Sequence, residues 1–164
     1  MRHVVRQSVT LPAPPELLYA MYVDAALHAA FTGSPVVIDD TPGSPFTAFE
    51  GLLTGSMLAT QPGSLVVQSW RSPTFGEGDG DSTVMLTFLP DDDGGGRIEL
   101  VHLDVPEHDL DGVAAGWKSH YWEPWRLYLE QELARLAEDA IDDIGDDQGT
   151  EQGEGQDDDR GDDA

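Results

Sequence analysis

Cysteine is absent from this 164-residue chain, and cationic side chains are scarce. Without cysteine there is no disulfide framework and no thiolate for catalysis or metal binding. Lysine and arginine together number 8, against 32 aspartate and glutamate residues, so the formal net charge is −24. A surface of this sign repels phosphate backbones and anionic lipid headgroups, so we expect neither nucleic acid nor a membrane as a partner.

Long hydrophobic runs are also missing. No stretch approaches the roughly 18 consecutive apolar residues of a membrane span, and the N-terminal sequence lacks the apolar core of a signal peptide. We therefore expect a cytoplasmic protein. The acidic excess runs along the whole chain, which is typical of a halophilic protein whose repulsion is screened by a salt-rich cytoplasm. An acidic surface that attracts a basic partner is the alternative interpretation.

The C-terminal end differs in composition from the rest. Beyond Ile141 the only large hydrophobic residue is Ile144, among many aspartates, glutamates and glycines. Such a segment cannot bury enough surface to offset the entropy of ordering it. We predict one domain over residues 1–137 and a disordered acidic tail over residues 138–164. The tail is interpreted as a solubilising extension, with an acidic interaction tail as the alternative.

Strands and turns dominate the middle of the chain. A first strand is predicted over His3–Leu11, followed by two short helices that begin near Pro15 and after the capping residue Asp24. Gly33 is expected to end the second helix. Further strands are predicted over residues 35–39, 46–53, 56–60, 65–71, 83–89 and 97–105, with turns that include Thr54-Gly55 and the run DDDGGG.

The last predicted element is a long helix from Asp109, its expected N-cap, to Ala137. Apolar residues recur there at helical spacing, and Pro124 should kink or locally open the helix. Only this element is long and apolar enough to cover the inner face of a concave sheet. The predicted fold is α+β: a curved antiparallel sheet of about six or seven strands wrapped around the long C-terminal helix.

Five motifs between Val9 and Leu129 carry a family resemblance. They are FTGSP (31–35), EGLLTG (50–55), QSWRS (68–72), LVHLDVP (100–106) and GWKSHYWEPW (116–125). With them the chain resembles the heat-shock protein 90 ATPase activator homologues, within the SRPBCC or START-like superfamily. The resemblance implies a helix-grip fold, often with a hydrophobic cavity between sheet and helix. It also implies binding of apolar molecules, activation of a chaperone ATPase, or, in some members, cyclase or other enzymatic activity.

Aromatic residues are the best candidates for such a cavity. Alternation along a strand places Trp70 and Arg71 on opposite faces, so an inward Trp70 leaves Arg71 facing solvent or a partner, with a structural salt bridge as its expected role. Trp and Tyr supply large buried area and keep a polar group for a ligand. The candidate ligand-binding residues are Phe31, Phe46, Trp70, His102, Trp117, Tyr121, Trp125 and Tyr128. The alternative for each is an ordinary place in the core.

No pattern predicts a catalytic set, a metal site or a cofactor. His102 and His120 are possible acids or bases, and His120 shares a helix face with Glu123, but no HExxH or comparable ligand spacing is present. The acidic run Asp91–Asp93 lacks the closing glutamate of a calcium loop. The leading hypothesis is a non-enzymatic domain, monomer or homodimer, that binds a small apolar molecule. A co-chaperone-like domain and a small cyclase or hydrolase are the alternatives.

Overall fold

The computed structural model describes residues 2–146. The strands of this range are β1 (Arg2–Leu11), β2 (Val36–Val37), β3 (Pro45–Ala48), β4 (Leu53–Gln61), β5 (Leu65–Trp70), β6 (Ser82–Pro90) and β7 (Gly96–Pro106). Its helices are α1 (Pro15–Val23), α2 (Ala25–Thr32), the 3₁₀ turn η1 (Glu107–Asp109), α3 (Leu110–Trp117), the π turn η2 (Lys118–Trp122) and α4 (Glu123–Asp146). None of these helices is long and apolar enough to cross a membrane.

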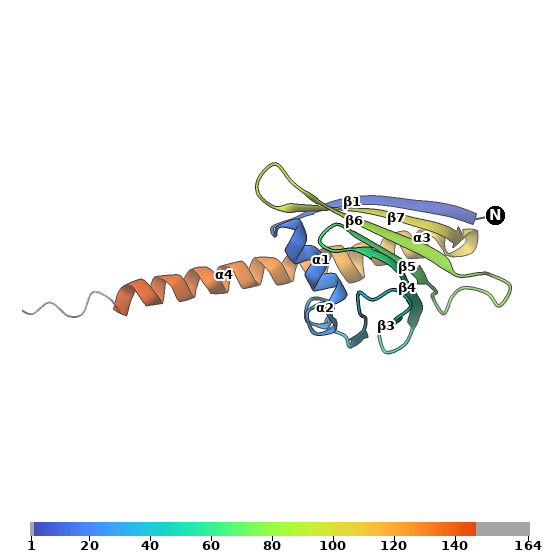
Figure 1. Ribbon diagram of the computed structural model, residues 1–164, viewed down its shortest axis with the longest axis horizontal. Coiled ribbons are helices and arrows are strands. Elements are labelled where there is room, and N and C mark those ends of the chain that lie inside the picture. The colour runs from blue at the N-terminus through green and yellow to red at the C-terminus, as the bar shows by residue number, and fades with distance from the viewer. Residues whose placement is uncertain (1, 147–164) are drawn as a thin grey trace, which may run out of the picture. The chain divides into compact units, whose positions relative to one another are not determined.

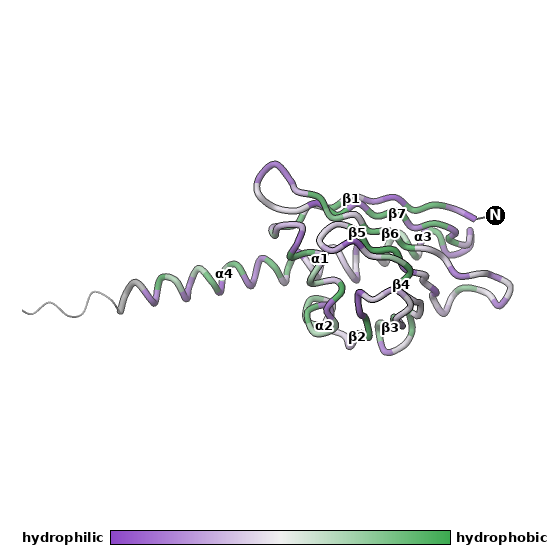
Figure 2. Tube along the Cα trace, viewed as in Figure 1, coloured by the Kyte–Doolittle hydropathy of each residue, from purple (hydrophilic) through white to green (hydrophobic). Residues whose placement is uncertain are grey.

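The seven strands form one antiparallel sheet in the order β1-β7-β6-β5-β4-β3-β2. Figure 1 shows β1 at one edge of this sheet and β3 toward the other. Buried and half-buried residues alternate along β6 and β7, as they must in a sheet with one covered face. The trace is hydrophobic along these strands and hydrophilic at the hairpin of residues 91–95 that joins them (Figure 2). The predicted fold class is thereby confirmed.

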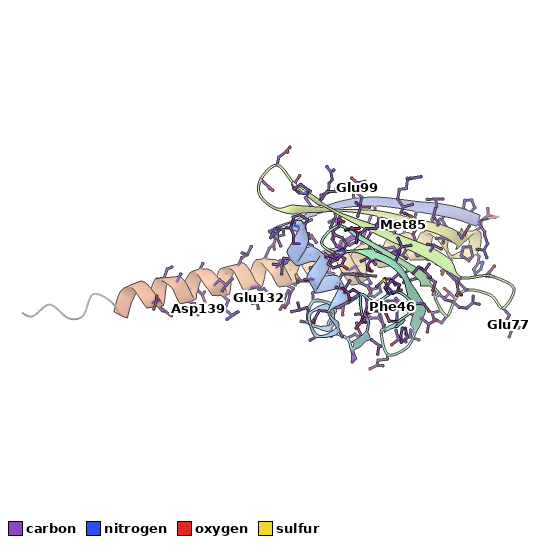
Figure 3. All side chains as sticks on the ribbon, viewed as in Figure 1. Phe46, Glu77, Met85, Glu99, Glu132 and Asp139 are labelled. Atoms are coloured by element: carbon purple, nitrogen blue, oxygen red, sulfur yellow. The ribbon has the colours of Figure 1, made fainter. Side chains whose placement is uncertain are left out.

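The core lies between this sheet and the helices of the compact unit that ends at Gln131. α1 packs on β6 and β7, and α3 packs on β1 and β7. Leu18, Tyr22 and Trp125 are fully buried between these layers, and Phe46 points into the same interior (Figure 3). By contrast, Glu77 lies at the tip of the β5–β6 loop. Apolar burial of this kind is the main stabilising contribution to the fold.

One predicted turn is wrong. Residues 54–55 lie inside β4, and the chain reverses instead at residues 49–52, directly after β3. Gly55 is needed for a close approach of strands, because a Cβ there would lie 1.9 Å from the carbonyl oxygen of Ser69. The actual turn places Phe49 and Glu50 at φ of 51° and 59°, a left-handed conformation that neither residue type signals in a sequence.

The long C-terminal helix widens to a π turn directly before Pro124, where the sequence predicts a kink or a local opening. Pro124 has no N–H to donate to the carbonyl four residues earlier, and its ring crowds that carbonyl. In the preceding turn Glu123 donates its N–H to the carbonyl of Lys118, five residues back, which is the π pattern. The local opening expected at Pro124 is confirmed, and π turns of this kind recur at functional sites.

Capping follows the sequence in one case and departs from it in another. The Asp24 side chain accepts a 2.9 Å hydrogen bond from the Leu27 N–H, and Gly33 ends α2 at φ 76°. Asp109 stands at the N-cap position of α3, but its carboxylate makes no cap bond and accepts from the Thr74 hydroxyl instead. The expected N-cap is therefore used to join a loop to the helix.

The helix α4 continues past residue 137, where the sequence places the end of the domain. Its residues from Glu132 onward belong to a second unit, in which Arg135 pairs with Glu132 at 2.8 Å and with Asp139 at 3.5 Å. Residues 138–146 of the expected tail are helical in the structure. Residues 147–164 lie outside the described residues.

Candidate functional site

A pocket of about 430 Å³ opens between the end of β5, the β3–β4 turn and one face of the helix α3–η2. Its walls are mostly apolar or aromatic. The lining residues are Phe49, Leu52, Leu53, Trp70, Ser72, Pro73, Thr74, Asp109, Gly112, Val113, Gly116, Trp117, His120 and Tyr121. The size and the apolar character are typical of sites for small organic molecules.

The helical wall follows from sequence spacing. Its residues from Asp109 to Tyr121 recur at intervals of three and four, so they share one helix face. Two of them, Gly112 and Gly116, carry no side chain and leave space between the larger neighbours. A Cβ added at Gly116 would meet only His120 Cδ2, at 3.9 Å, so nothing in the fold fills the position. The glycines therefore help to create the pocket.

The opposite wall comes from the β3–β4 turn. The left-handed backbone of Phe49 directs its ring onto the helix, with ring centroids 5.4 Å from His120 and 6.0 Å from Tyr121. Leu52 in the same turn lines the pocket and remains 59% exposed. A non-glycine residue at positive φ carries backbone strain, which persists only where surrounding contacts hold it. The turn thus supplies an apolar, partly exposed rim.

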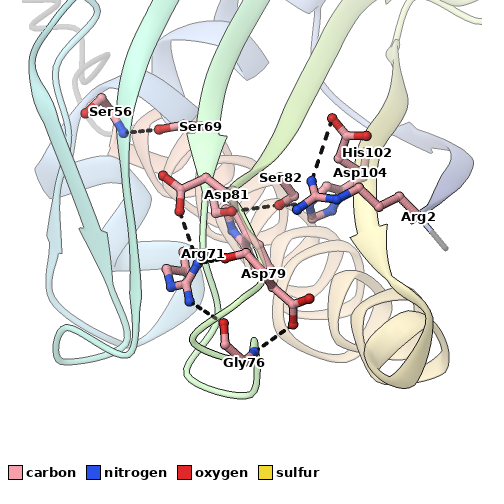
Figure 4. Close-up of polar contacts among 11 residues, drawn as sticks. Arg2, Ser56, Ser69, Arg71, Gly76, Asp79, Asp81, Ser82, His102 and Asp104 are labelled. Atoms are coloured by element: carbon pink, nitrogen blue, oxygen red, sulfur yellow. Dashed lines mark hydrogen bonds and ion pairs between the residues drawn. The ribbon is translucent and has the colours of Figure 1, made fainter.

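Trp70 and Trp117, the two indole walls, are both held by His102. Trp117 Nε1–H donates to His102 Nδ1 at 3.0 Å, so the neutral imidazole carries its proton on Nε2 and donates it to Ser82 Oγ at 2.7 Å. The Ser82 hydroxyl then donates to the Trp70 carbonyl at 2.7 Å, and the Trp70 ring stands edge-on to the imidazole at 4.8 Å. Figure 4 shows the Ser82–His102 bond. This chain of bonds fixes both walls.

His102 therefore lies behind the pocket rather than in it. Its side chain is completely buried, and this burial lowers the pKa of His102 to about 4. Both ring nitrogens already have partners, so the residue has no free lone pair or proton to offer a ligand. The expectation that it contacts a ligand or acts as a base receives no support from this geometry.

Tyr121 is held by a second buried histidine, which the sequence did not single out. His28 Nδ1–H donates to the Tyr22 carbonyl at 2.7 Å, and its Nε2 accepts from the Tyr121 hydroxyl at 3.1 Å. Burial lowers the pKa of His28 to about 4 and raises the pKa of Tyr121. The Tyr22 hydroxyl in turn donates to Gln68 Oε1 at 2.7 Å. The ring of Tyr121 is thus locked in place from behind.

The structure brings together three of the eight candidate residues in the pocket: Trp70, Trp117 and Tyr121. Phe31 and Trp125 stack on each other at 4.2 Å inside the core, where Phe46 is also buried. Tyr128 is half-buried and packs against the core. These four residues belong to the hydrophobic core or pack against it, as the alternative interpretation of the sequence expects.

Several pocket residues were missed because their role depends on loops. Phe49 and Leu52 lie in a turn that was misplaced by a few residues, while Pro73 and Thr74 lie in a loop with no periodic signal. The sequence offers His120 as an acid or base, or as a metal ligand together with Glu123. It lines the pocket, but within residues 2–146 no hydrogen bond or ion pair joins it to Glu123. The family motif EGLLTG, at residues 50–55, is the one sequence signal that overlaps the turn at residues 49–52.

Arg71 anchors the loop that follows β5. Its guanidinium donates to the carbonyls of Gly76 and Asp79 at 2.7 and 2.8 Å and pairs with Asp81 at 3.4 Å (Figure 4). These bonds agree with the structural role expected for Arg71 and occupy its charged group away from the pocket. Among the residues of the described range no cluster of three or more His, Asp or Glu could hold a metal ion.

A curved antiparallel sheet that holds a C-terminal helix, with a pocket between them, defines the helix-grip class. Sequence comparison makes the assignment narrower. The model of the family described as Activator of Hsp90 ATPase homolog 1-like protein matches residues 12–130. The chain belongs to this family.

Two curated relatives have names that correspond to this family. The chain is 29% identical over 100 residues to an activator of 90 kDa heat shock protein ATPase homolog of Dictyostelium discoideum, covering 61% of this chain and 26% of that protein. It is 25% identical over 115 residues to the activator of 90 kDa heat shock protein ATPase homolog 2 of Mus musculus, covering 70% of this chain and 34% of that protein. The chain thus spans only about a quarter to a third of these relatives.

Solved structures support the fold. An HSP90 activator from Plasmodium falciparum superposes with a TM-score of 0.64 at 22% identity, covering 72% of this chain and 89% of that one. CalU16 from Micromonospora echinospora gives 0.62 at 24% identity, covering 83% and 80%. Ara h 8.0201 gives 0.63 at 13% identity, covering 80% and 99%. At these identities the similarity concerns the fold alone.

Proposed function

We propose that this domain binds a small, largely apolar molecule in the pocket between the β3–β4 turn and the helix α3–η2. The observation that carries the proposal is the aromatic-walled hollow of about 430 Å³, within the range of roughly 300–1,000 Å³ typical of small-molecule sites.

The construction of the walls supports this function. Trp70, Trp117 and Tyr121 are held from behind by two fully buried histidines, so the pocket side of these rings is pre-organised. Pre-organisation lowers the entropic cost of binding, because the side chains need not be ordered when the ligand arrives. The glycines at 112 and 116 keep the floor clear.

A pair of substitutions tests the proposal. Gly116→Leu places a side chain into the pocket at a position where an added Cβ meets only His120 Cδ2, at 3.9 Å. Ala115→Leu adds a comparable side chain on an exposed position of the same helix and serves as the matched control. Glycine is a poor helix former, so the first change should not weaken the helix.

The assay is a titration with 1-naphthylmethanol, followed by tryptophan fluorescence and calorimetry. We expect one binding site in the wild type and in Ala115→Leu, and an affinity at least about tenfold lower in Gly116→Leu, a difference of about 1.4 kcal/mol. Absence of binding to the wild type would contradict the proposal. Equal affinity in both variants would show that the probe binds elsewhere.

A second candidate function is stimulation of a heat-shock protein 90 ATPase, favoured by membership of a family named for that activity. The test is the ATPase rate of the purified chaperone as the domain is added. A saturable increase that disappears with heat-denatured domain supports this function. An unchanged rate, together with no complex in sedimentation at low and high salt, argues against it.

A further inference from the structure

The one fixed charge in the pocket lining is negative. The lining contains no lysine or arginine, and its one carboxylate belongs to Asp109. Two cations, Arg71 and Lys118, neighbour lining residues along the chain. The guanidinium of Arg71 is occupied by the β5–β6 loop, and Lys118 lines a different hollow, with Trp122 and Glu123. We infer that the pocket takes an apolar molecule carrying a positively charged nitrogen, an organic ammonium, in preference to a carboxylate or phosphate. This inference rests on the proposed function and specifies its ligand class.

The aromatic walls favour a cation. Four aromatic rings line the pocket, those of Phe49, Trp70, Trp117 and Tyr121. The ring centroids of Trp117 and Tyr121 are 4.9 Å apart. Ring faces carry negative partial charge and attract ammonium groups, most strongly where water is excluded. The same faces repel an anionic headgroup. An aromatic wall therefore tolerates an apolar body and adds attraction for a cationic one.

Asp109 supplies a fixed partner for the charge. It lies eight residues before Trp117 on the same helix face, about 12 Å along the axis at 1.5 Å per residue. The Thr74 hydroxyl donates to its Oδ2 and holds the carboxylate at the rim, which leaves further lone pairs for an N–H donor. A molecule whose apolar part lies over Gly112, Val113 and Trp117 can direct its nitrogen toward this group.

The charge of the whole chain acts in the same direction. At a net charge of −24 the surface potential raises the local concentration of small cations and lowers that of anions. This general attraction is screened by salt, whereas an ion pair inside a half-buried pocket is screened less. The two contributions can therefore be separated by experiment.

The test uses three probes of similar size: 1-naphthylmethylamine, protonated at neutral pH, the neutral 1-naphthylmethanol, and 1-naphthylacetate. Affinities are measured on the full chain and on Asp109→Asn. Asn keeps an acceptor for Thr74 and is a good N-cap, so the fold should persist. Asp111→Asn, an exposed position on the same helix, makes the same change in net charge and serves as the control.

We expect the amine to bind about fivefold or more tighter than the alcohol at moderate salt, and the carboxylate to bind weakest. Asp109→Asn should remove most of this preference of the pocket for the amine over the alcohol, and Asp111→Asn should preserve it. Equal affinities for the three probes, or a preference that survives Asp109→Asn, overturn the inference but leave the proposed function intact. Failure of all three probes to bind overturns both.

Discussion

The two buried histidines predict a specific dependence of stability on pH. His28 and His102 are fully buried and neutral, and burial lowers the pKa of each from its ordinary value of 6.5 to about 4. The unfolded chain therefore binds protons at a higher pH than the folded chain does. The stabilising contribution of each neutral histidine is fully present above pH 6.5 and is lost as the pH falls toward 4.

The size of this contribution to the free energy of unfolding follows from the lowering of the two pKa values. The fall of each pKa from 6.5 to about 4, at about 1.4 kcal/mol per pH unit, amounts to about 3.5 kcal/mol for each histidine. Within this pH window each contributes a slope of about 1.4 kcal/mol per pH unit. Protonation of the many carboxylates relieves repulsion in this acidic chain and acts in the opposite direction, so the wild-type curve alone cannot isolate the histidines.

Comparison with histidine variants isolates the contribution of His28 and His102 to the pH dependence of stability. The free energy of unfolding in urea is measured at pH 7, 6 and 5 for the wild type, His102→Gln and His28→Gln, with the exposed His120→Gln as control. The variants at buried positions should be less stable at pH 7 and should approach the wild type, below pH 6.5, by about 1.4 kcal/mol per pH unit. Parallel curves for wild type and His102→Gln would refute the argument that this residue is held neutral by burial.

Three further predictions concern other parts of the fold. Gly55→Ala should destabilise by about 2–4 kcal/mol because its Cβ overlaps the neighbouring strand, whereas Gly78→Ala, in open space, should change the urea midpoint little; similar midpoints would contradict this. Trp117→Phe should cost about 1–2 kcal/mol because His102 Nδ1 loses its donor, and an unchanged midpoint would argue against that bond. Arg71→Lys should speed amide exchange in the β5–β6 loop about tenfold with little effect on global stability, and unchanged protection would show that the loop is held otherwise.

Much of the fold could be predicted because its signals are local. Alternation in the strands that became β6 and β7 gives a sheet with one buried face, and Asp24, Gly33 and Pro124 each act through the backbone of their own turn. The Trp70 and Arg71 pair follows the same alternation, with one side chain in the pocket and the other in the loop. These residues need no knowledge of distant segments.

The parts that could not be predicted depend on contacts between segments far apart in the sequence. Gly55 looks like a turn residue until the approach of Ser69, 14 residues later, is known. His28 lies in an alanine-rich helix with no motif, and its role depends on Tyr121, 93 residues away. The aromatic stripe of the last helix correctly marks a buried face, but spacing alone does not say that Tyr121 lines a hollow while Trp125 is packed core.

The pocket can be tested most directly with the four tryptophan indole N–H signals in a ¹H–¹⁵N spectrum. The account predicts that 1-naphthylmethanol shifts the signals of Trp70 and Trp117, which line the pocket, with one common dissociation constant, and leaves that of the fully buried Trp125 nearly unchanged. The same titration of Gly116→Leu should leave the indole signals in place. Shifts confined to other indoles, or shifts of Trp70 and Trp117 that persist in Gly116→Leu, would contradict it.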